Sequence, residues 1–434
     1  MNSSLAQSRP RSRPFGQNYA FVVIGVIFVC LLIAAGLRSA PAVMMLPLED
    51  AFGWRRDVIS FAAATGILLY GLTGPFAAAL MERIGLRRTL VGALALMSAS
   101  TASSLLMTQS WQLVATWGVF SGVGSGAVAM VLGATVVTRW FKTNRGLMMG
   151  LMSASSATGL LVFLPLLASL AESGGWKPVA MAVSIATACL IPLAFLLVPE
   201  RPASIGTVRY GADADDVPPV PPAAQGNFIA HTFGALRRAA ATRTFWYLFA
   251  TFFICGFTTN GLVGTHLIAF CGDNGISEVK AAGLLSMMGI FDLIGTTFSG
   301  WLTDRFDARK LLGVYYAVRG LALIYLPFSG FSGPALVVFA VFYGLDWIAT
   351  VPPTLKLTNE AFGERSGPIV FGWILAGHQV GAAVAAYFGG YMHELQGSYD
   401  LAFQIAGMTG IIAACLALLI NATPVRMDPE PQAA

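Results

Sequence analysis

The sequence predicts an all-α membrane protein in which twelve transmembrane helices form two six-helix, pseudo-symmetric bundles. Three observations support this fold class. First, 56% of the residues are hydrophobic and only 11% are charged, whereas an ordinary soluble domain is about 25% charged. Second, apolar stretches long enough to cross a bilayer recur along the whole chain. Third, the first half of the chain resembles the second half when the two are aligned.

The apolar stretches are continuous, which favours helices, because the strands of a membrane barrel alternate apolar and polar residues. A helix needs about 20 residues to cross the bilayer. The basic residues Arg9, Arg11 and Arg13 precede the first stretch, but this stretch is longer than the apolar core of a secretory leader, so we expect it to remain as a span. The expected spans are residues 19–48, 57–81, 87–107, 111–138, 145–171, 177–198, 244–271, 279–303, 310–328, 332–357, 366–393 and 399–421.

Basic side chains outside the spans indicate the orientation of the chain. The only basic residues in the loops on one side of the membrane are Arg55, Arg56, Lys177 and Lys280. The other basic residues outside the spans lie on the opposite side. Because short positively charged loops stay in the cytoplasm, we expect a multi-pass protein of the bacterial inner membrane with both termini cytoplasmic. The net charge of +5 therefore reflects topology, and we expect no nucleic-acid partner.

The expected organisation follows from these spans. The linker contains the run DVPPVPPAAQG, whose prolines favour a flexible connector, and then a short amphipathic segment that we expect to form a helix on the inner membrane surface. The expected regions are a cytoplasmic N-terminal tail (1–18), an N-terminal six-helix bundle (19–198), a cytoplasmic linker with the interfacial helix (199–243), a C-terminal six-helix bundle (244–421) and a cytoplasmic tail (422–434).

When the sequence is aligned with itself after one constant shift in residue number, the first half of the chain matches the second. This offset aligns Arg83 with Arg305 and Arg87 with Arg309, in addition to several glycines. Two arginines repeated in the same short motif indicate a duplicated six-helix unit. Parallel repeats of this kind enclose a site near the middle of the membrane and rock about it.

The two copies of this motif also carry a family resemblance. The segments AALMERIGLRR (78–88) and GWLTDRFDARK (300–310) resemble the inner-loop signature of the major facilitator superfamily. The resemblance implies a gating role, in which the motif holds neighbouring helices together on the inner side when the carrier opens outward. Anchoring by positive charge is the alternative explanation. The gating residues implied by the motif are Glu82, Arg83, Gly300, Asp304 and Arg305.

Further segments resemble one branch of that superfamily. LEDAFGWRRDVIS, RWFKTNRGLMMGLMSASSATG and PERPASIG are similar to the monocarboxylate transporter and oxalate/formate antiporter branches. In the monocarboxylate branch, an acid in the eighth helix is followed four residues later by an arginine that holds the substrate carboxylate. Here Asp292 occupies the first position and Thr296 the second. Oxalate/formate antiporters also carry a lysine in the eleventh helix, and the nearest candidate in this sequence is His378. The usual anion clamp of the branch is therefore absent.

Charged side chains inside the membrane are candidate functional residues, because each costs about 2.5 kcal/mol or more at the bilayer centre. Arg38 in the first span has no acid of its own half at the same depth, and a guanidinium suits the capture of a carboxylate. We predict that Arg38 binds the substrate; the alternatives are an outer-vestibule charge and an ion pair with the other half. The offset aligns Arg38 with Asn260 and Tyr70 with Asp292, which makes Asn260 and Tyr70 further binding candidates, although Tyr70 could simply pack.

Asp292 and Arg319 lie at similar depths on two helices joined by a tight loop, so we expect them to meet. The pair would be either static or opened by proton exchange at Asp292. Asp346 lies in a helix broken by prolines, which makes it a candidate for the proton path or for a structural hydrogen bond.

Two histidines complete the candidate set. We assign His378 and its neighbour Gln379 to substrate binding and His266 to proton coupling. Packing is the alternative for each histidine.

No nucleotide-binding loop, metal-ligand spacing or nucleophile motif is present in the sequence, so we expect no enzyme activity, cofactor or metal site. What remains is a secondary active transporter: a proton-coupled carrier of a small organic anion, a monocarboxylate, that works by alternating access as a monomer in the lipid bilayer. The alternative is a proton-driven exporter of drugs or siderophores. A non-transporting receptor would need a signalling domain.

Overall fold

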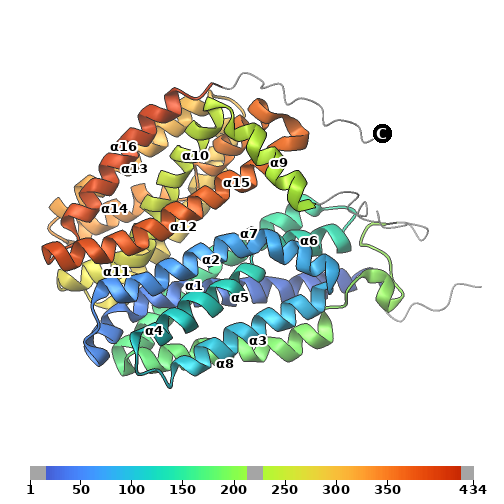
Figure 1. Cartoon of the computed structure of the whole chain (residues 1–434), viewed down its shortest axis with the longest axis horizontal. Coiled ribbons are helices and arrows are strands. Elements are labelled where there is room, and N and C mark those ends of the chain that lie inside the picture. Colours follow the sequence, from blue (N-terminus) through green and yellow to red (C-terminus); the bar gives the residue numbers. More distant parts are fainter. Residues whose placement is uncertain (1–15, 213–227, 422–434) are drawn as a thin grey trace, which may run out of the picture.

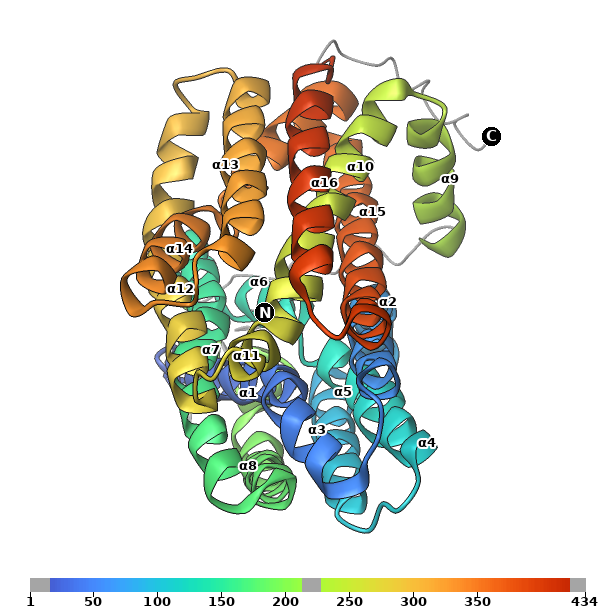
Figure 2. The same cartoon turned by 90° about the vertical axis from the view of Figure 1, so that its left-hand side faces the viewer.

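A computed structural model of the protein describes residues 16–212 and 228–421. These residues form two helical bundles that lie side by side, one from each half of the chain (Figures 1 and 2). Apart from one isolated bridge between Phe141 and Tyr210, the described secondary structure is helical and contains no named strand. The all-α fold class is therefore confirmed. The tails at 1–15 and 422–434 and part of the linker lie outside the described residues.

The N-terminal bundle contains the first six expected spans. The fourth span is interrupted: it runs through four consecutive helices, with a break at Val128 and Ala129. The bundle consists of α1 (Tyr19–Phe52), α2 (Arg56–Arg83), α3 (Leu86–Ser104), α4 (Ser110–Leu113), the π-helix η1 (Val114–Phe120), α5 (Ser121–Ala127), α6 (Met130–Trp140), α7 (Arg145–Gly174) and α8 (Trp176–Leu197), followed by the short 3₁₀ helix η2 (Pro202–Ile205).

The C-terminal bundle follows the linker helix α9 (Phe228–Ala240). It consists of α10 (Arg243–Gly256), the π-helix η3 (Phe257–Val263), α11 (Gly264–Asp273), α12 (Glu278–Thr303), α13 (Ala308–Phe328), α14 (Gly333–Asp346), α15 (Val351–Gln396) and α16 (Asp400–Leu418). The label α15 covers two helices joined at Gly363, whose φ of 76° and ψ of 163° interrupt the helix. Glycine tolerates this conformation because it has no Cβ.

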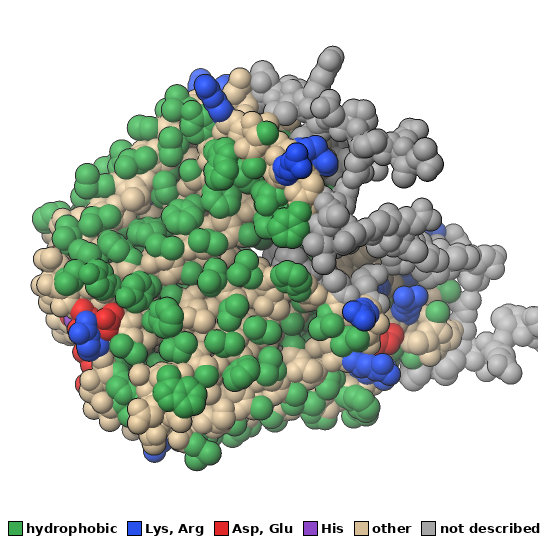
Figure 3. Space-filling model, viewed as in Figure 1, with side chains coloured by type: hydrophobic (Ala, Val, Ile, Leu, Met, Phe, Trp, Pro, Cys, Tyr) green, Lys and Arg blue, Asp and Glu red, His purple; other side chains and the backbone are tan. Residues whose placement is uncertain are grey.

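Each expected span coincides with a helical segment. Among the described residues, ten helices are long and apolar enough to cross a membrane. The remaining two expected spans correspond to α3, which has 19 residues and contains Arg87 and Arg88 in its first turn, and to α7, which has 30 residues. Many large apolar side chains are exposed, among them Phe76, Phe195 and Phe328. Hydrophobic side chains are spread over the middle of the face in Figure 3, while most of the charged side chains lie toward its ends. This distribution suits a lipid-facing surface.

Carboxylates fix two helix starts at the end of the molecule that carries the linker, which we call the linker end. The Glu200 carboxylate accepts hydrogen bonds from the backbone N–H groups of Leu86 and Arg87, at 2.5 and 3.1 Å. Asp307 accepts one from the backbone N–H of Arg309 at 2.9 Å and pairs with its guanidinium at 2.7 Å. These bonds satisfy helix donors that otherwise have no partner. The Arg309 hydrogen bond lowers the pKa of Asp307 to about 2.

The two bundles meet mainly through α2 against α15, α7 against α12 and α1 against α11. Gly71 of α2 lies so close to Gln379 of α15 that a Cβ would overlap it. Toward the linker end the bundles draw apart, as Figure 1 shows on its right-hand side. A site that both halves line would therefore lie at the interface between the bundles.

Candidate functional site

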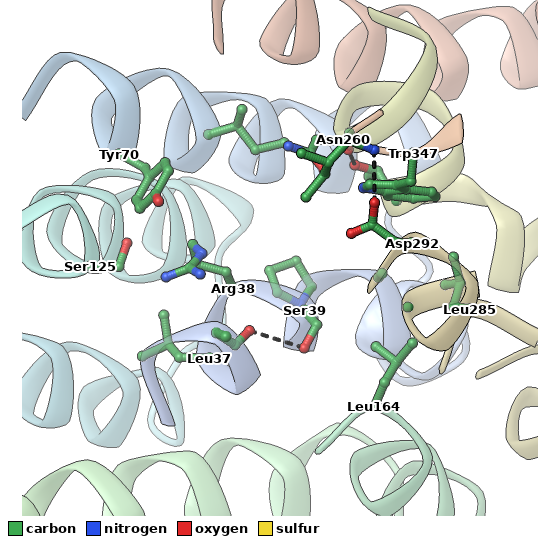
Figure 4. Close-up of a pocket in the computed structure, with 18 of the residues that line it drawn as sticks. Leu37, Arg38, Ser39, Tyr70, Ser125, Leu164, Asn260, Leu285, Asp292 and Trp347 are labelled. Atoms are coloured by element: carbon green, nitrogen blue, oxygen red, sulfur yellow. Dashed lines mark hydrogen bonds between the residues drawn. The ribbon is translucent and has the colours of Figure 1, made fainter. Parts of the chain in front are cut away.

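A cavity of about 550 Å³ lies between the two bundles. Both halves of the chain contribute to its wall, as the repeat predicts. The polar residues of the wall are Arg38 and Ser39 from α1, Tyr70 from α2, Ser121 and Ser125 from α5, Asn260 from η3, Thr265 from α11, Asp292, Thr296 and Thr297 from α12, and Gln379 from α15 (Figure 4). Trp117 of η1 and Trp347, which follows α14, supply large aromatic surfaces.

Arg38 lies in the wall of this cavity. Its guanidinium carbon is 4.7 Å from the centre of the Tyr70 ring, and Figure 4 shows both side chains on the same side of the pocket as Ser125. Within residues 16–212 and 228–421, no carboxylate lies within ion-pair distance of Arg38. The geometry leaves this guanidinium available to a ligand.

Asp292 lies in the opposite wall, with 5% of its surface exposed. Its Oδ1 accepts hydrogen bonds from the Thr296 hydroxyl and the Ile348 backbone N–H, both at 2.9 Å. Its Oδ2 accepts none from the described residues, and Figure 4 shows one carboxylate oxygen turned toward the open interior of the pocket. Thr296, the position at which the resemblance to the monocarboxylate branch implies an arginine, donates its hydroxyl to this acid.

Asn260 and Gln379 also reach the cavity, from η3 and α15. Asn260 is exposed, and no side-chain hydrogen bond to another described residue occupies its amide. The structure thus brings Arg38, Tyr70, Asn260 and Gln379 from the predicted binding set to one cavity, together with Asp292.

Arg319 does not pair with Asp292, so the predicted pairing is wrong. Arg319 is fully buried, and its Nε lies 2.7 Å from Asp346 Oδ2. One of its terminal nitrogens also donates to the Asp346 carbonyl at 2.5 Å and to the Trp347 carbonyl at 3.2 Å. The end of α14 leaves these carbonyls without helical partners, and a guanidinium can satisfy several of them at once.

The Arg319–Asp346 pair lies behind the cavity wall, not in it. The other terminal nitrogen of Arg319 lies 2.9 Å from Cys255 Sγ, a contact that no sequence signal indicated. Asp346 Oδ1 is buried and has no hydrogen-bond partner among the described residues. Trp347 and Ile348 connect the two acids, because Arg319 holds the carbonyl of Trp347 and Asp292 holds the N–H of Ile348.

Neither histidine contributes to the cavity wall. His378 is 9% exposed and lies against Phe252, with ring centres 5.0 Å apart. Its neighbour Gln379 faces the cavity instead, because consecutive residues of a helix point about 100° apart. His266 is fully buried, with ring nitrogens 2.7 Å from the Ala386 carbonyl and 3.3 Å from the Tyr399 hydroxyl. Packing accounts for both positions, so His378 is not a binding residue in this geometry.

At the end opposite the linker, Arg56 of α2 joins the two halves. Its guanidinium makes two hydrogen bonds to Asp273 of α11, at 2.6 and 2.7 Å, and one to Glu49 of α1 at 2.7 Å. His393 of α15 lies 3.0 Å from the same guanidinium. Figure 2 views the molecule from this end, where α1, α2, α11 and α15 come together. Sequence reasoning placed Arg56 in an outer loop and missed this contact.

The signature motif lies at the linker end. Arg83 and Asp304 are exposed, and no ion pair joins Asp304 to another described residue. Arg305 lies over the Trp301 ring, with its guanidinium carbon 4.2 Å from the ring centre, and Gly300 has open space around its Cα. The side chain of Glu82 lies outside the described set. The latch that the resemblance implies is not formed at Asp304 in this conformation.

The comparisons with known proteins agree with this geometry. A family model described as Major Facilitator Superfamily matches residues 27–367 and 272–434. Rat monocarboxylate transporter 13 is 28% identical over 89% of this chain and 85% of its own length. The oxalate:formate antiporter of Oxalobacter formigenes is 24% identical over 93% of this chain and 92% of its own.

Among solved structures, a bacterial homologue of the human lysosomal transporter Spinster, in an inward-facing and unoccupied conformation, superposes with a TM-score of 0.73 at 16% identity, covering 94% of this chain and 97% of that one. This likeness concerns the fold. The family model spans most of the sequence, and the relatives that match along nearly the whole chain are transporters. The chain therefore belongs to the Major Facilitator Superfamily, whose members are membrane transporters and not enzymes.

Proposed function

We propose that this protein is a proton-coupled carrier of a small organic anion, a monocarboxylate, and that it works by alternating access. The observation that carries the proposal is Arg38, a guanidinium in a cavity between two bundles with no carboxylate partner among the described residues. Arg38 is partly buried, and a bound substrate that displaced water from its charge would make that charge costly unless the substrate paired with it. A substrate carboxylate supplies the missing charge, and the guanidinium can hold it with two parallel hydrogen bonds.

The other residues near Arg38 suit the same ligand. The Tyr70 ring lies against the guanidinium and limits its rotation, while the Tyr70 hydroxyl and Ser125 offer hydrogen bonds to a second oxygen. The relatives named for monocarboxylate transport and oxalate:formate exchange support this substrate class. Residues from both halves of one chain line the cavity, and this supports a carrier that works as a monomer.

Asp292 is the proposed proton-coupling residue. It faces the cavity, where protons can reach it, and its Oδ1 holds the Ile348 N–H at the break between α14 and α15. Protonation removes a negative charge from the cavity as the substrate anion brings one in. It also weakens the hydrogen bond to Ile348, because a charged acceptor is stronger than a neutral one. Proton binding at Asp292 would thus be linked to the position of α14 and α15, with the buried Arg319–Asp346 pair as the fixed support behind them.

Alternating access requires that each end of the cavity can close. Arg56 and Asp273 hold the halves together at one end, and Asp304 is free to form a latch at the other. If the linker end is cytoplasmic, as the basic residues predict, the Arg56–Asp273 contact closes the periplasmic side in the present conformation. We propose this orientation in the bacterial inner membrane, with both termini inside.

A proton-driven exporter of apolar compounds is the second candidate, because Trp117, Trp347 and aliphatic side chains provide much of the wall. Arg38 favours the anion carrier, since an apolar substrate would leave its charge without a partner.

Transport into proteoliposomes tests the proposal. We would measure uptake of radiolabelled acetate, lactate, benzoate and 3-phenylpropanoate with and without an imposed pH gradient. The account predicts that at least one acid accumulates and that the gradient drives it. Failure of all four acids to enter, combined with transport of a neutral dye, would favour the exporter.

A further inference from the structure

The two walls of the cavity carry opposite charges that do not neutralise each other. Figure 4 shows Arg38, Tyr70 and Ser125 on one side and Asn260, Asp292 and Trp347 on the other. Arg38 comes from α1 of the N-terminal half and Asp292 from α12 of the C-terminal half, and no ion pair joins them. A ligand that fits this cavity has to satisfy both walls.

The wall that contains Asp292 can accept a hydrogen bond from a ligand. Oδ1 already accepts two hydrogen bonds, whereas Oδ2 accepts none from the described residues. The amide of Asn260, exposed in the same wall, has no side-chain hydrogen bond to another described residue. A substrate with a purely apolar far end would displace water from these groups without replacing its hydrogen bonds, which is unfavourable.

The size and lining of the cavity indicate what lies between the two polar ends. Its volume of about 550 Å³ falls within the range of roughly 300–1,000 Å³ that holds drug-sized ligands. The aromatic rings of Trp117 and Trp347 form part of the wall. An acid of two or three carbons would fill only a small part of this volume, whereas an acid with an apolar body of about ring size would fill more of it.

We propose, building on the carboxylate site of the proposed function, that the substrate is an organic acid with its carboxylate on Arg38, an apolar middle and a neutral hydroxyl that contacts Asp292 and Asn260. A hydroxyl suits Asp292 better than an ammonium group does. It donates to the charged carboxylate and accepts from the protonated one, so its hydrogen bond survives both states of a proton-coupling residue, while an ammonium can only donate.

Such a substrate also links the halves of the carrier. Its carboxylate is held by α1 and its hydroxyl by α12, so it favours any conformation in which these helices approach one another. A ligand can shift a conformational equilibrium only through its different affinity for the two states. Asp292 and Asn260 would therefore determine which acids are transported efficiently.

Calorimetric titration of the purified full-length protein in lipid nanodiscs tests this inference. The probes are 3-(4-hydroxyphenyl)propanoate, 3-phenylpropanoate and propanoate. We expect the hydroxylated acid to bind about tenfold more tightly than its unsubstituted partner, the size of effect expected for one hydrogen bond to a charged group, and propanoate to bind most weakly. In Asn260→Ala and Asp292→Ala the preference for the hydroxyl should shrink, while Asp400→Ala, which removes an exposed acid outside the cavity wall, should keep it.

The outcomes separate this inference from the proposed function. Equal affinity of the two aromatic acids, with both lost in Arg38→Gln, would overturn the hydroxyl preference and leave the carboxylate site standing. Binding of acids that is indifferent to Arg38→Gln would overturn both. If Asp292→Ala does not fold, as judged by circular dichroism and size-exclusion chromatography, the wild-type comparison and Asn260→Ala decide the question.

Discussion

Arg56 of α2 and Asp273 of α11 form an ion pair with two hydrogen bonds that crosses the interface between the bundles. The Arg56 side chain is only 7% exposed. It also makes hydrogen-bond contacts with Glu49 of its own half and with His393 of the other half. Because the pair joins the halves at the end opposite the linker, it stabilises the conformation in which that end is closed.

Arg56→Gln should weaken this closure. Removing one partner of a desolvated pair costs about 2–5 kcal/mol, and since Asp273 is 26% exposed we expect the lower value, roughly a 30-fold gain in the open population. A cysteine introduced at the buried Ser60 would report this gain as faster labelling by a membrane-impermeant maleimide, above the background of the native cysteines. Arg55→Gln is the matched control, because the Arg55 side chain is 64% exposed and such pairs contribute little. Unchanged labelling in Arg56→Gln would show that the pair does not hold the halves closed.

Asp292→Asn should separate transport from its proton drive. The amide oxygen can still accept from Ile348 and Thr296, but the side chain no longer takes up a proton. We expect exchange of substrate between the two sides to continue within a few-fold of wild type, while accumulation driven by a pH gradient disappears. Asp400→Asn makes the same change at an exposed acid outside the cavity wall and should keep the pH response. Gradient-driven accumulation by Asp292→Asn at the wild-type level would assign the proton to another group.

The Arg319–Asp346 pair should matter mainly for stability. Removing one partner of a buried pair costs about 3–5 kcal/mol, whereas replacing both by apolar residues often costs little. Arg319→Met is therefore expected to lower the Tm of the purified protein clearly, and the double variant Arg319→Met with Asp346→Leu to recover most of the loss. Thermal unfolding followed by intrinsic fluorescence measures both. A Tm unaffected by the single change would mean that the pair contributes no stability.

Asp307 should hold the first turn of α13 over the whole neutral and mildly acidic range. Its pKa is lowered to about 2, below the usual value for Asp of about 3.9. The stabilisation is therefore complete above the usual pKa and is lost only as the pH falls toward 2. Asp307→Ala should speed hydrogen exchange at the amide of Arg309. The expected loss of stability is about 0.5–2 kcal/mol, which is typical of a helix cap. Asp304→Ala, which removes an acid whose side chain makes no hydrogen bond or ion pair with the described residues of α13, serves as the control. Equal exchange in the two variants would argue against the cap.

Hydropathy and the internal offset were enough to predict the helices and the two bundles, because both depend on signals that run along the chain. They also predicted that Arg38 and Asp292 would reach a central cavity. The partner of Arg319 was not predictable in the same way. The rise of a helix fixes the depth of a side chain, but its direction around the axis depends on packing, and packing turned Arg319 toward Asp346 at the end of α14.

The same limit applies to the histidines and to Arg56. Neighbouring helix positions face different ways, so His378 lies against Phe252 while Gln379 reaches the cavity. Arg56 and Asp273 are 217 residues apart in the sequence, and no pattern within either segment indicates that they meet. Contacts between halves depend on the conformation of the carrier, which local sequence does not encode.

Counterflow in proteoliposomes is the most direct test of the role of Arg38, because it needs binding and rocking but no ion gradient. Wild type, Arg38→Lys and Arg38→Gln would be loaded with the acid that wild type takes up fastest, and entry of its labelled form would be followed. Loss of charge-assisted hydrogen bonds of about 1.5–3 kcal/mol predicts that Arg38→Gln falls by one to two orders of magnitude, with Arg38→Lys in between because an ammonium lacks the planar fork. Counterflow by Arg38→Gln at the wild-type rate would contradict the account.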